Sequence, residues 1–60
     1  MKVRKFIHKN TIITIENNGI VRRTDLIETK MITTLIGSYY KWYIDKFVIK
    51  DLLEKGFREI

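Results

Sequence analysis

The chain has 60 residues, of which 45% are hydrophobic, and a formal net charge of +5. At this length it makes one domain, residues 1–60, and buries only about 60% of the surface that its unfolded form exposes. Because it has no cysteine and a single histidine, disulfide bridges and a structural metal site cannot add to its stability. We therefore expect a dense apolar core, with a homo-oligomer as a second source of buried area.

The excess positive charge lies in the first part of the chain. Residues 1–24 carry six basic groups against one acidic group, whereas residues 25–60 carry six of each and are neutral. The basic groups of the first part are Lys2, Arg4, Lys5, Lys9, Arg22 and Arg23. Such an asymmetry is typical of a surface that faces a polyanion.

Neither a signal peptide nor a membrane span is predicted. Lys9, Asn10 and Glu16 interrupt the apolar stretch that would have to follow a basic signal-peptide start. The most lipophilic window, residues 31–44, is shorter than a bilayer span and contains Lys41. Together with the absence of cysteine, this favours a cytoplasmic protein without a membrane partner.

The first 16 residues predict a hairpin. Residues 3–8 and 11–16 are rich in β-branched and aromatic side chains, which favour strands. Lys9 and Asn10 between them predict a two-residue turn, which would set Phe6 opposite Ile13.

A second hairpin follows, through Asn17, Asn18 and Gly19. Two asparagines before a glycine predict a three-residue loop that closes with Gly19 at positive φ, and a third strand from residue 20 to about residue 24. This loop sets Ile15 opposite Val21, whereas a two-residue turn would set Ile15 opposite Arg22, which is a poorer apolar match. One face of the predicted sheet then shows Phe6, Ile13, Ile15 and Val21, and the other shows Lys5, Thr14 and Arg22 beside Ile7, Ile12 and Ile20.

Residues 25–44 fit more than one structure. Asp25 and Glu28 resemble a helix capping box, but the β-branched residues that follow favour a strand over about residues 30–36. We predict a turn near residues 25–28, that strand, a turn at Gly37 and Ser38, and a strand over residues 39–44. In this interpretation Trp42 lies in the core. The competing interpretation is a helix over residues 39–55, because apolar residues there also recur at helical spacing.

The C-terminal part predicts a helix over about residues 46–55. Asp45 is a suitable N-cap, Phe47, Val48 and Leu52 make an apolar stripe, and Gly56 can end the helix. The expected fold is α+β: a small five-stranded antiparallel sheet, or an SH3-like partly open barrel, with one C-terminal helix. Its element order resembles that of SH3-like barrels that end in a helix, including archaeal chromatin proteins. The likeness is one of order alone, so no functional residue is carried over.

The sequence does not predict an enzyme. His8 and Ser38 are the sole histidine and serine, and they fall in separate parts of the predicted sheet, so no nucleophile and base come together. No metal-ligand spacing or phosphate-binding glycine loop is present. We therefore expect no catalytic residue, no metal and no cofactor.

The leading hypothesis for function is nucleic-acid binding. Arginine pairs well with phosphate, and tyrosines beside a lysine can stack on bases. The predicted nucleic-acid-binding residues are Lys2, Arg4, Lys5, Lys9, Arg22, Arg23, Tyr39, Lys41 and Tyr43. The alternative is that these lysines and arginines only solvate a sheet edge and prevent it from aggregating.

The alternative hypothesis is a protein-binding regulator or inhibitor that docks through residues 39–43 or through a sheet edge. Tyr39 and Tyr43, on either side of Lys41, also have the composition of an interface hot spot. The small size and the abundance of isoleucine and lysine are typical of phage or plasmid accessory proteins, which fits either hypothesis.

Overall fold

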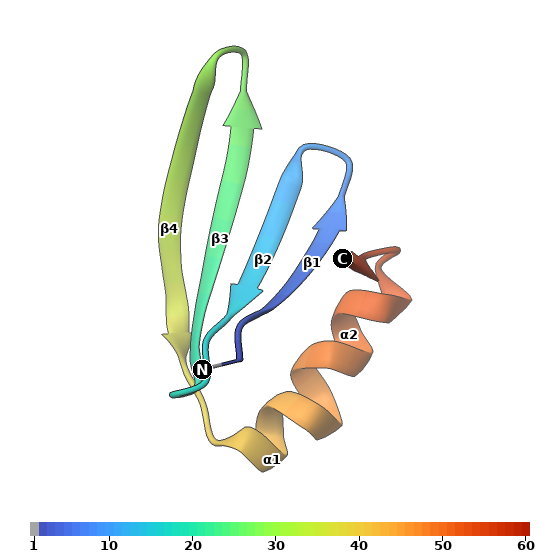
Figure 1. The fold of residues 1–60 in the computed structure, drawn as a ribbon. Helices are drawn as coiled ribbons and strands as arrows, with labels where there is room; N and C mark the ends of the chain where they lie inside the picture. Colours follow the sequence, from blue (N-terminus) through green and yellow to red (C-terminus); the bar gives the residue numbers. More distant parts are fainter. Residues whose placement is uncertain (1) are drawn as a thin grey trace.

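The computed structural model describes residues 2–60, which form one open sheet and one interrupted helix (Figure 1). In chain order the elements of these residues are β1 (Arg4–His8), β2 (Thr11–Ile15), β3 (Ile20–Ile27), β4 (Lys30–Ser38), α1 (Lys41–Tyr43), η1 (Ile44–Val48), α2 (Ile49–Glu54) and β5 (Arg58–Glu59). The strands are antiparallel in the order β4-β3-β2-β1-β5. The α+β class and the five-stranded sheet are confirmed, and the sheet is not closed into a barrel.

The first three strands have the predicted register. Phe6 lies opposite Ile13, and Ile15 lies opposite Val21. Gly19 closes the second turn with a φ of 90°, and its N–H donates to the Glu16 carbonyl at 3.0 Å. The local turn residues therefore determine which side chains face the core.

The prediction for residues 25–38 was partly wrong. β3 continues to Ile27, so Asp25 lies in a strand and caps no helix. The turn is made by Glu28 and Thr29, and β4 then runs straight through Gly37, where a turn was expected. The long β3–β4 hairpin projects beyond the β1–β2 hairpin (Figure 1).

The strand predicted over residues 39–44 is a helix instead. Tyr40 is the extended N-cap residue, and the N–H groups of Tyr43 and Ile44 donate to its carbonyl at 3.0 Å. The continuous-helix alternative was therefore closer, and Asp45 lies inside the helix rather than at its start. The reason is packing: in a helix Ile44 reaches the core, whereas Trp42, which we expected there, is 61% exposed.

Residues 41–54 form one helix that widens in its middle. In η1 the Ile49 N–H donates to the Ile44 carbonyl, one residue further back than in an α-helix. The helix ends as predicted at Gly56, whose φ is 96°. The Gly56 N–H donates to Leu53 and the Phe57 N–H to Leu52, which is the Schellman pattern.

A short fifth strand, β5, was not predicted. It pairs with β1 and sets Glu59 opposite Phe6. Arg4 strengthens this pairing, since its guanidinium donates to both carboxylate oxygens of Glu59 at 2.7 and 2.8 Å. The end of the chain thus covers the β1 edge of the sheet.

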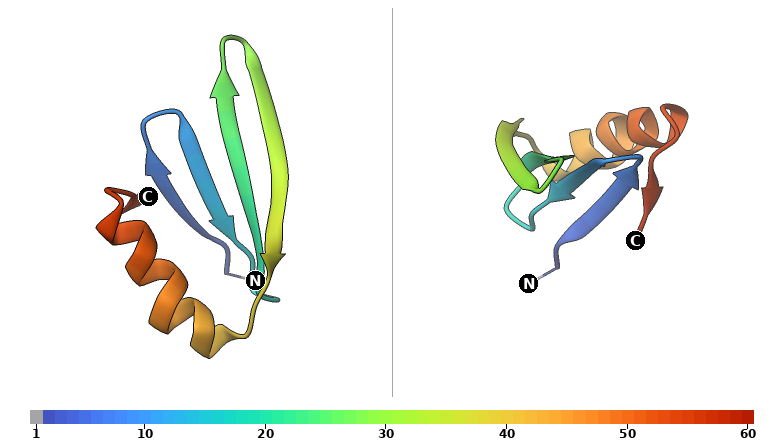
Figure 2. Two further views of the ribbon diagram at one scale, coloured as in Figure 1. Left: turned by 180° about the vertical axis from the view of Figure 1, so that it is seen from behind. Right: turned by 90° about the horizontal axis from the view of Figure 1, so that it is seen from above.

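The core lies between the helix and one half of the sheet. The buried apolar residues of the part that the structure describes are Phe6, Ile13, Ile15, Val21, Ile44 and Leu52. The helix runs along the β1–β2 side of the sheet, as the turned views show (Figure 2). β3 and β4 extend past it, so the helix-side surface of these two strands is left largely uncovered.

Candidate functional site

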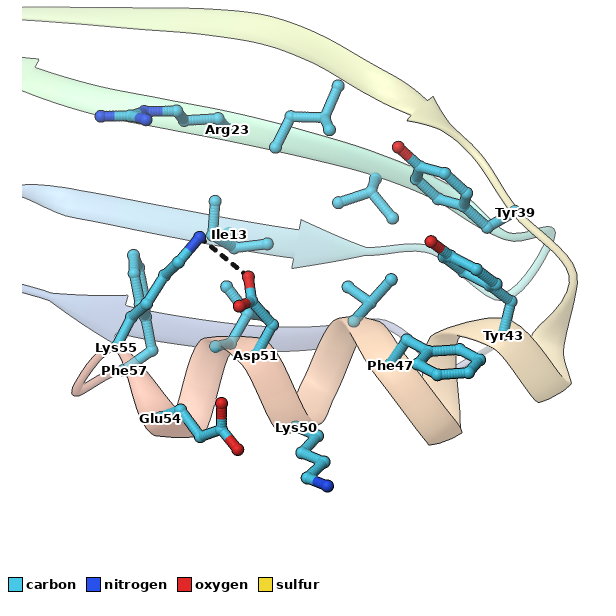
Figure 3. A pocket seen from close by; sticks show the side chains of 14 residues that line it. Ile13, Arg23, Tyr39, Tyr43, Phe47, Lys50, Asp51, Glu54, Lys55 and Phe57 are labelled. Atoms are coloured by element: carbon cyan, nitrogen blue, oxygen red, sulfur yellow. Dashed lines mark ion pairs between the residues drawn. The ribbon is translucent and has the colours of Figure 1, made fainter.

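A groove lined by apolar and charged side chains lies between the helix and the uncovered half of the sheet (Figure 3). Its volume is about 670 Å³. The sheet contributes Ile13, Val21 and Ile36, and the helix contributes Phe47 and Leu52 among others. The groove exists because the helix covers the β1–β2 side and leaves the same face of β3 and β4 open.

A cluster of aromatic side chains forms one end of the groove. Tyr39 and Tyr43 stack with ring centroids 5.4 Å apart and an interplanar angle of 16°. Tyr43 contacts Phe47 at 5.0 Å, and Trp42 meets Phe47 edge to face at 6.4 Å. We call Tyr39, Trp42, Tyr43 and Phe47 the aromatic cluster. Trp42, Tyr43 and Phe47 are exposed, whereas Tyr39 is half-buried against the core. Contiguous exposed apolar surface of this kind marks interaction sites.

Two of the three basic side chains that line the groove, Arg23 and Lys55, are paired with acids, and the third is Lys50. Lys55 contacts Asp51 at 2.8 Å, one helical turn apart. Arg23 donates to Asp25 at 3.1 Å, and the Thr11 hydroxyl donates to the same carboxylate at 2.9 Å. The Thr11 hydroxyl, followed by Arg23, holds the pKa of Asp25 below its ordinary value. The groove therefore combines apolar and charged side chains, and part of its charge is neutralised within the protein.

The predicted nucleic-acid-binding residues fall on separate surfaces. Lys5, Thr14 and Arg22 form the predicted row, but that row lies on the sheet face opposite the groove. Arg23 lines the groove on the other face, and Lys9 lies in the β1–β2 turn with a φ of 52°. Neighbouring positions on a strand point to opposite faces, so Arg22 and Arg23 cannot contact one flat ligand together.

A second hollow, of about 900 Å³, gathers other predicted residues near the N-terminal segment and the start of the helix. Lys2, Arg4 and Lys41 line it together with Glu16, Asp45 and Glu59. Arg4 is bound to Glu59, which raises the pKa of the arginine and lowers that of the glutamate. Arg22, on the open face, is paired with Glu16. Arg4, Arg22 and Arg23, the three arginines of the first 24 residues, each have an acidic partner within the protein.

Arg23, Tyr39 and Tyr43 are the predicted residues that line the groove. Ile36, Phe47 and Val48 also line it, and we had assigned none of them to a binding surface. The helical spacing of residues 40–52 was the signal that could have placed Phe47, since it sets Tyr43 and Phe47 one turn apart.

The described part of the chain was also searched for a metal-binding site. Residues 2–60 contain no cluster of three or more histidine, aspartate or glutamate side chains that could hold a metal ion. His8 lies against Phe57, with ring centroids 5.4 Å apart. None of the helices in this part of the chain has the length and apolarity needed to cross a bilayer.

Comparison with known proteins adds no functional assignment. No protein-family model, curated protein or solved structure matches the chain. The groove, the aromatic cluster and the distribution of charge are therefore the observations from which a function can be inferred.

Proposed function

We propose that this chain is a non-enzymatic binding protein whose groove accepts an apolar segment of a partner protein. The observation that carries the proposal is the open groove with the aromatic cluster at its end. A groove of this kind can hold one face of an amphipathic helix, or an extended segment with regularly spaced apolar side chains.

The composition of the groove supports a protein partner. Tyrosine and tryptophan are enriched at the energetic centres of protein interfaces, where they combine large apolar area with a polar tip. Phe47 keeps 47% of its surface exposed beside Trp42 and Tyr43. Burying such side chains against a partner would remove apolar surface from water. The binding free energy would become more favourable by about 25 cal/mol for each Å² of apolar surface buried.

The charge distribution supports the same choice. A polyanion site needs cations that are free to replace the counter-ions of phosphate groups. Here Arg23 is occupied by Asp25, and Lys55 by Asp51. A partner segment that fits this border is apolar at its centre, and its binding depends little on salt.

Selection from a random peptide library displayed on phage tests the proposal. We expect peptides with spaced aromatic and aliphatic residues to be enriched on the parent protein. Phe47→Glu should weaken their binding at least about tenfold, because it places a charge against apolar surface. Leu53→Glu is the matched control, since Leu53 is a helix residue of similar exposure, 54%, and does not line the groove. Equal loss in both variants, or no enriched peptide, would contradict the proposal.

Nucleic-acid binding remains the second candidate, and the row of Lys5, Thr14 and Arg22 on the open sheet face favours it. The same protein should be titrated with mixed-sequence DNA and RNA oligonucleotides at low and high salt. Steeply salt-dependent binding that Lys5→Ala with Arg22→Ala abolishes, while Phe47→Glu leaves it intact, would select this candidate over the peptide groove.

A further inference from the structure

β4 is an edge strand with little of the protection that edge strands usually have, since its one bulge lies near its C-terminal end. It pairs with β3 on one side, and no strand of the described residues pairs with its other side. Met31 and Leu35 on this strand are 70% and 63% exposed. Natural sheets guard such edges with charged residues, proline or a covering element, yet Lys30 is the sole charged residue of β4. The edge therefore offers unpaired backbone groups flanked by apolar side chains.

We propose that β4 pairs antiparallel with β4 of a second copy of this chain and joins the two sheets into one. Another strand is the occupant that satisfies open N–H and C=O groups along an edge. An identical strand also suits the charge pattern. In the antiparallel arrangement the two Lys30 side chains lie at opposite ends of the pair, about 20 Å apart along the strands.

The irregularity in β4 fixes where the two copies meet. Arg22 pairs with Leu35 and Val21 with Gly37, so Ile36 is the extra residue of a bulge. The regular part of the edge therefore ends near Leu35. Pairing centred on Thr33 sets Met31 of one copy opposite Leu35 of the other and keeps the contact within this part. It covers the two most exposed apolar side chains of β4 with each other.

The surface area of the chain agrees with a partner of this size. The protein exposes 4813 Å², whereas a compact monomer of 7.2 kDa exposes roughly 4,100 Å². The excess of roughly 700 Å² per chain is close to the roughly 800 Å² that each partner buries in a typical specific interface.

The joined sheet has a consequence for the groove. The two-fold axis of an antiparallel strand pair runs perpendicular to the sheet. Both helices then lie on the same face, and the two grooves open towards each other across the paired β4 strands. This pairing stands apart from the proposed function, because it uses the edge of β4 and does not require the groove to be filled.

Single cysteines test the pairing, because the chain has none of its own. Thr33→Cys places the two sulfur atoms at the two-fold axis, within disulfide reach, and should give a covalent dimer quickly on mild oxidation. Leu53→Cys, exposed on the helix, is the control and should cross-link much more slowly. Equal rates for the two variants would overturn the proposal.

Mixing two further variants tests the register. Met31→Cys and Leu35→Cys should each cross-link poorly alone, since like positions lie about 13 Å apart along the strands. Mixed together they should cross-link rapidly, and failure to do so would overturn the pairing centred on Thr33.

Sedimentation of the parent protein supplies the measurement that needs no substitution. The average mass should rise from 7.2 kDa towards twice that value as the protein concentration is raised from micromolar to near millimolar. A protein that stays monomeric throughout would overturn the proposal and leave the edge to an extended segment of a different protein. Neither outcome bears on peptide capture by the groove, so the two proposals fail separately.

Discussion

Gly19 is the residue on which the arrangement of the first three strands depends most directly. Its φ of 90° belongs to the left-handed region that side chains rarely adopt. A Cβ atom at this position would lie 2.2 Å from the carbonyl oxygen of Tyr39. The Tyr39 N–H also donates to the Gly19 carbonyl at 3.0 Å. The turn thus fixes the β2–β3 register and guides the chain from β4 into the helix.

Substitution of Gly19 by alanine should therefore be costly. We expect Gly19→Ala to lower the free energy of unfolding by about 2 kcal/mol or more, measured by urea denaturation. Gly37→Ala is the control, because its Cβ would meet the movable side chain of Tyr39 rather than the backbone. If the two variants unfold at the same urea concentration, the close contact between Gly19 and the Tyr39 carbonyl does not determine the stability of the turn.

The ion pair between Arg4 and Glu59 links stability to pH. Hydrogen bonds from Arg4 lower the pKa of Glu59 in the folded chain. A carboxyl group with a lowered pKa contributes stability that is present above its unfolded pKa and is lost as the pH falls through the folded pKa. The pairing of β5 with β1 should therefore weaken in acid.

We expect the parent to lose stability between about pH 5 and about pH 2, and Glu59→Gln to lose less over the same range. The effect is modest because the pair is at the surface. Urea midpoints at several pH values measure it. A variant that loses as much stability as the parent would show that Glu59 does not contribute to the acid dependence. Asp25, whose pKa is lowered by Thr11 and Arg23, would then be the carboxyl group to test.

At the scale of elements, the helix is held by few buried residues. Ile44 and Leu52 are its buried side chains, two turns apart, and Val48 and Ile49 pack beside them. The widened turn of η1 lies between these anchors. Phe47 therefore lines the groove, and Trp42 lies beside it and faces the solvent instead of the core.

Two alanine substitutions distinguish these roles. Leu52→Ala should cost about 2–4 kcal/mol of unfolding free energy, enough to unfold much of so small a protein. Trp42→Ala should cost less than about 1 kcal/mol, because Trp42 is largely exposed. Native tryptophan fluorescence should agree by reporting a water-exposed indole. If the Trp42 variant is as unstable as the Leu52 variant, Trp42 is part of the core.

The sequence predicts the elements whose signals are local. Three strands and their register were predicted from the turn residues Asn17, Asn18 and Gly19 and from the β-branched residues around them. The end of the helix was predicted from Gly56. Residues 39–44 fit both a strand and a helix, and the choice depends on distant contacts, those of Ile44 with the core residues of the sheet. β5 is two residues long and forms against a strand at the other end of the chain, so its residues carry no signal of their own.

The candidate site was predictable to a smaller extent. Tyr39 and Tyr43 were assigned to a binding surface with Lys41 from their positions in a predicted strand, and the structure has a helix from Lys41 instead. The groove itself depends on where the helix lies across the sheet, and no local pattern gives that. The charge asymmetry is a true feature of the sequence, but folding divides those residues between two faces and pairs the arginines with acids.

At the scale of the whole molecule, the chain is less compact than its mass requires. Its radius of gyration is 11.3 Å, whereas roughly 10.4 Å is typical for 60 residues. The long β3–β4 hairpin accounts for this shape, since it extends past the helix that covers the other strands. The helix covers one half of the sheet. The groove, the exposed aromatic cluster and the open β4 edge all lie at or beyond the border of the covered half.

The most direct test of the groove as the binding surface is a map of amide NMR shifts during titration with a library-selected peptide. A second titration with a mixed-sequence oligonucleotide serves as the comparison. We expect the peptide to shift Val21, Ile36 and Phe47 and to leave Lys5 and Thr14 unchanged. Shifts that concentrate on Lys5, Thr14 and Arg22, on the opposite face of the sheet, would contradict the account.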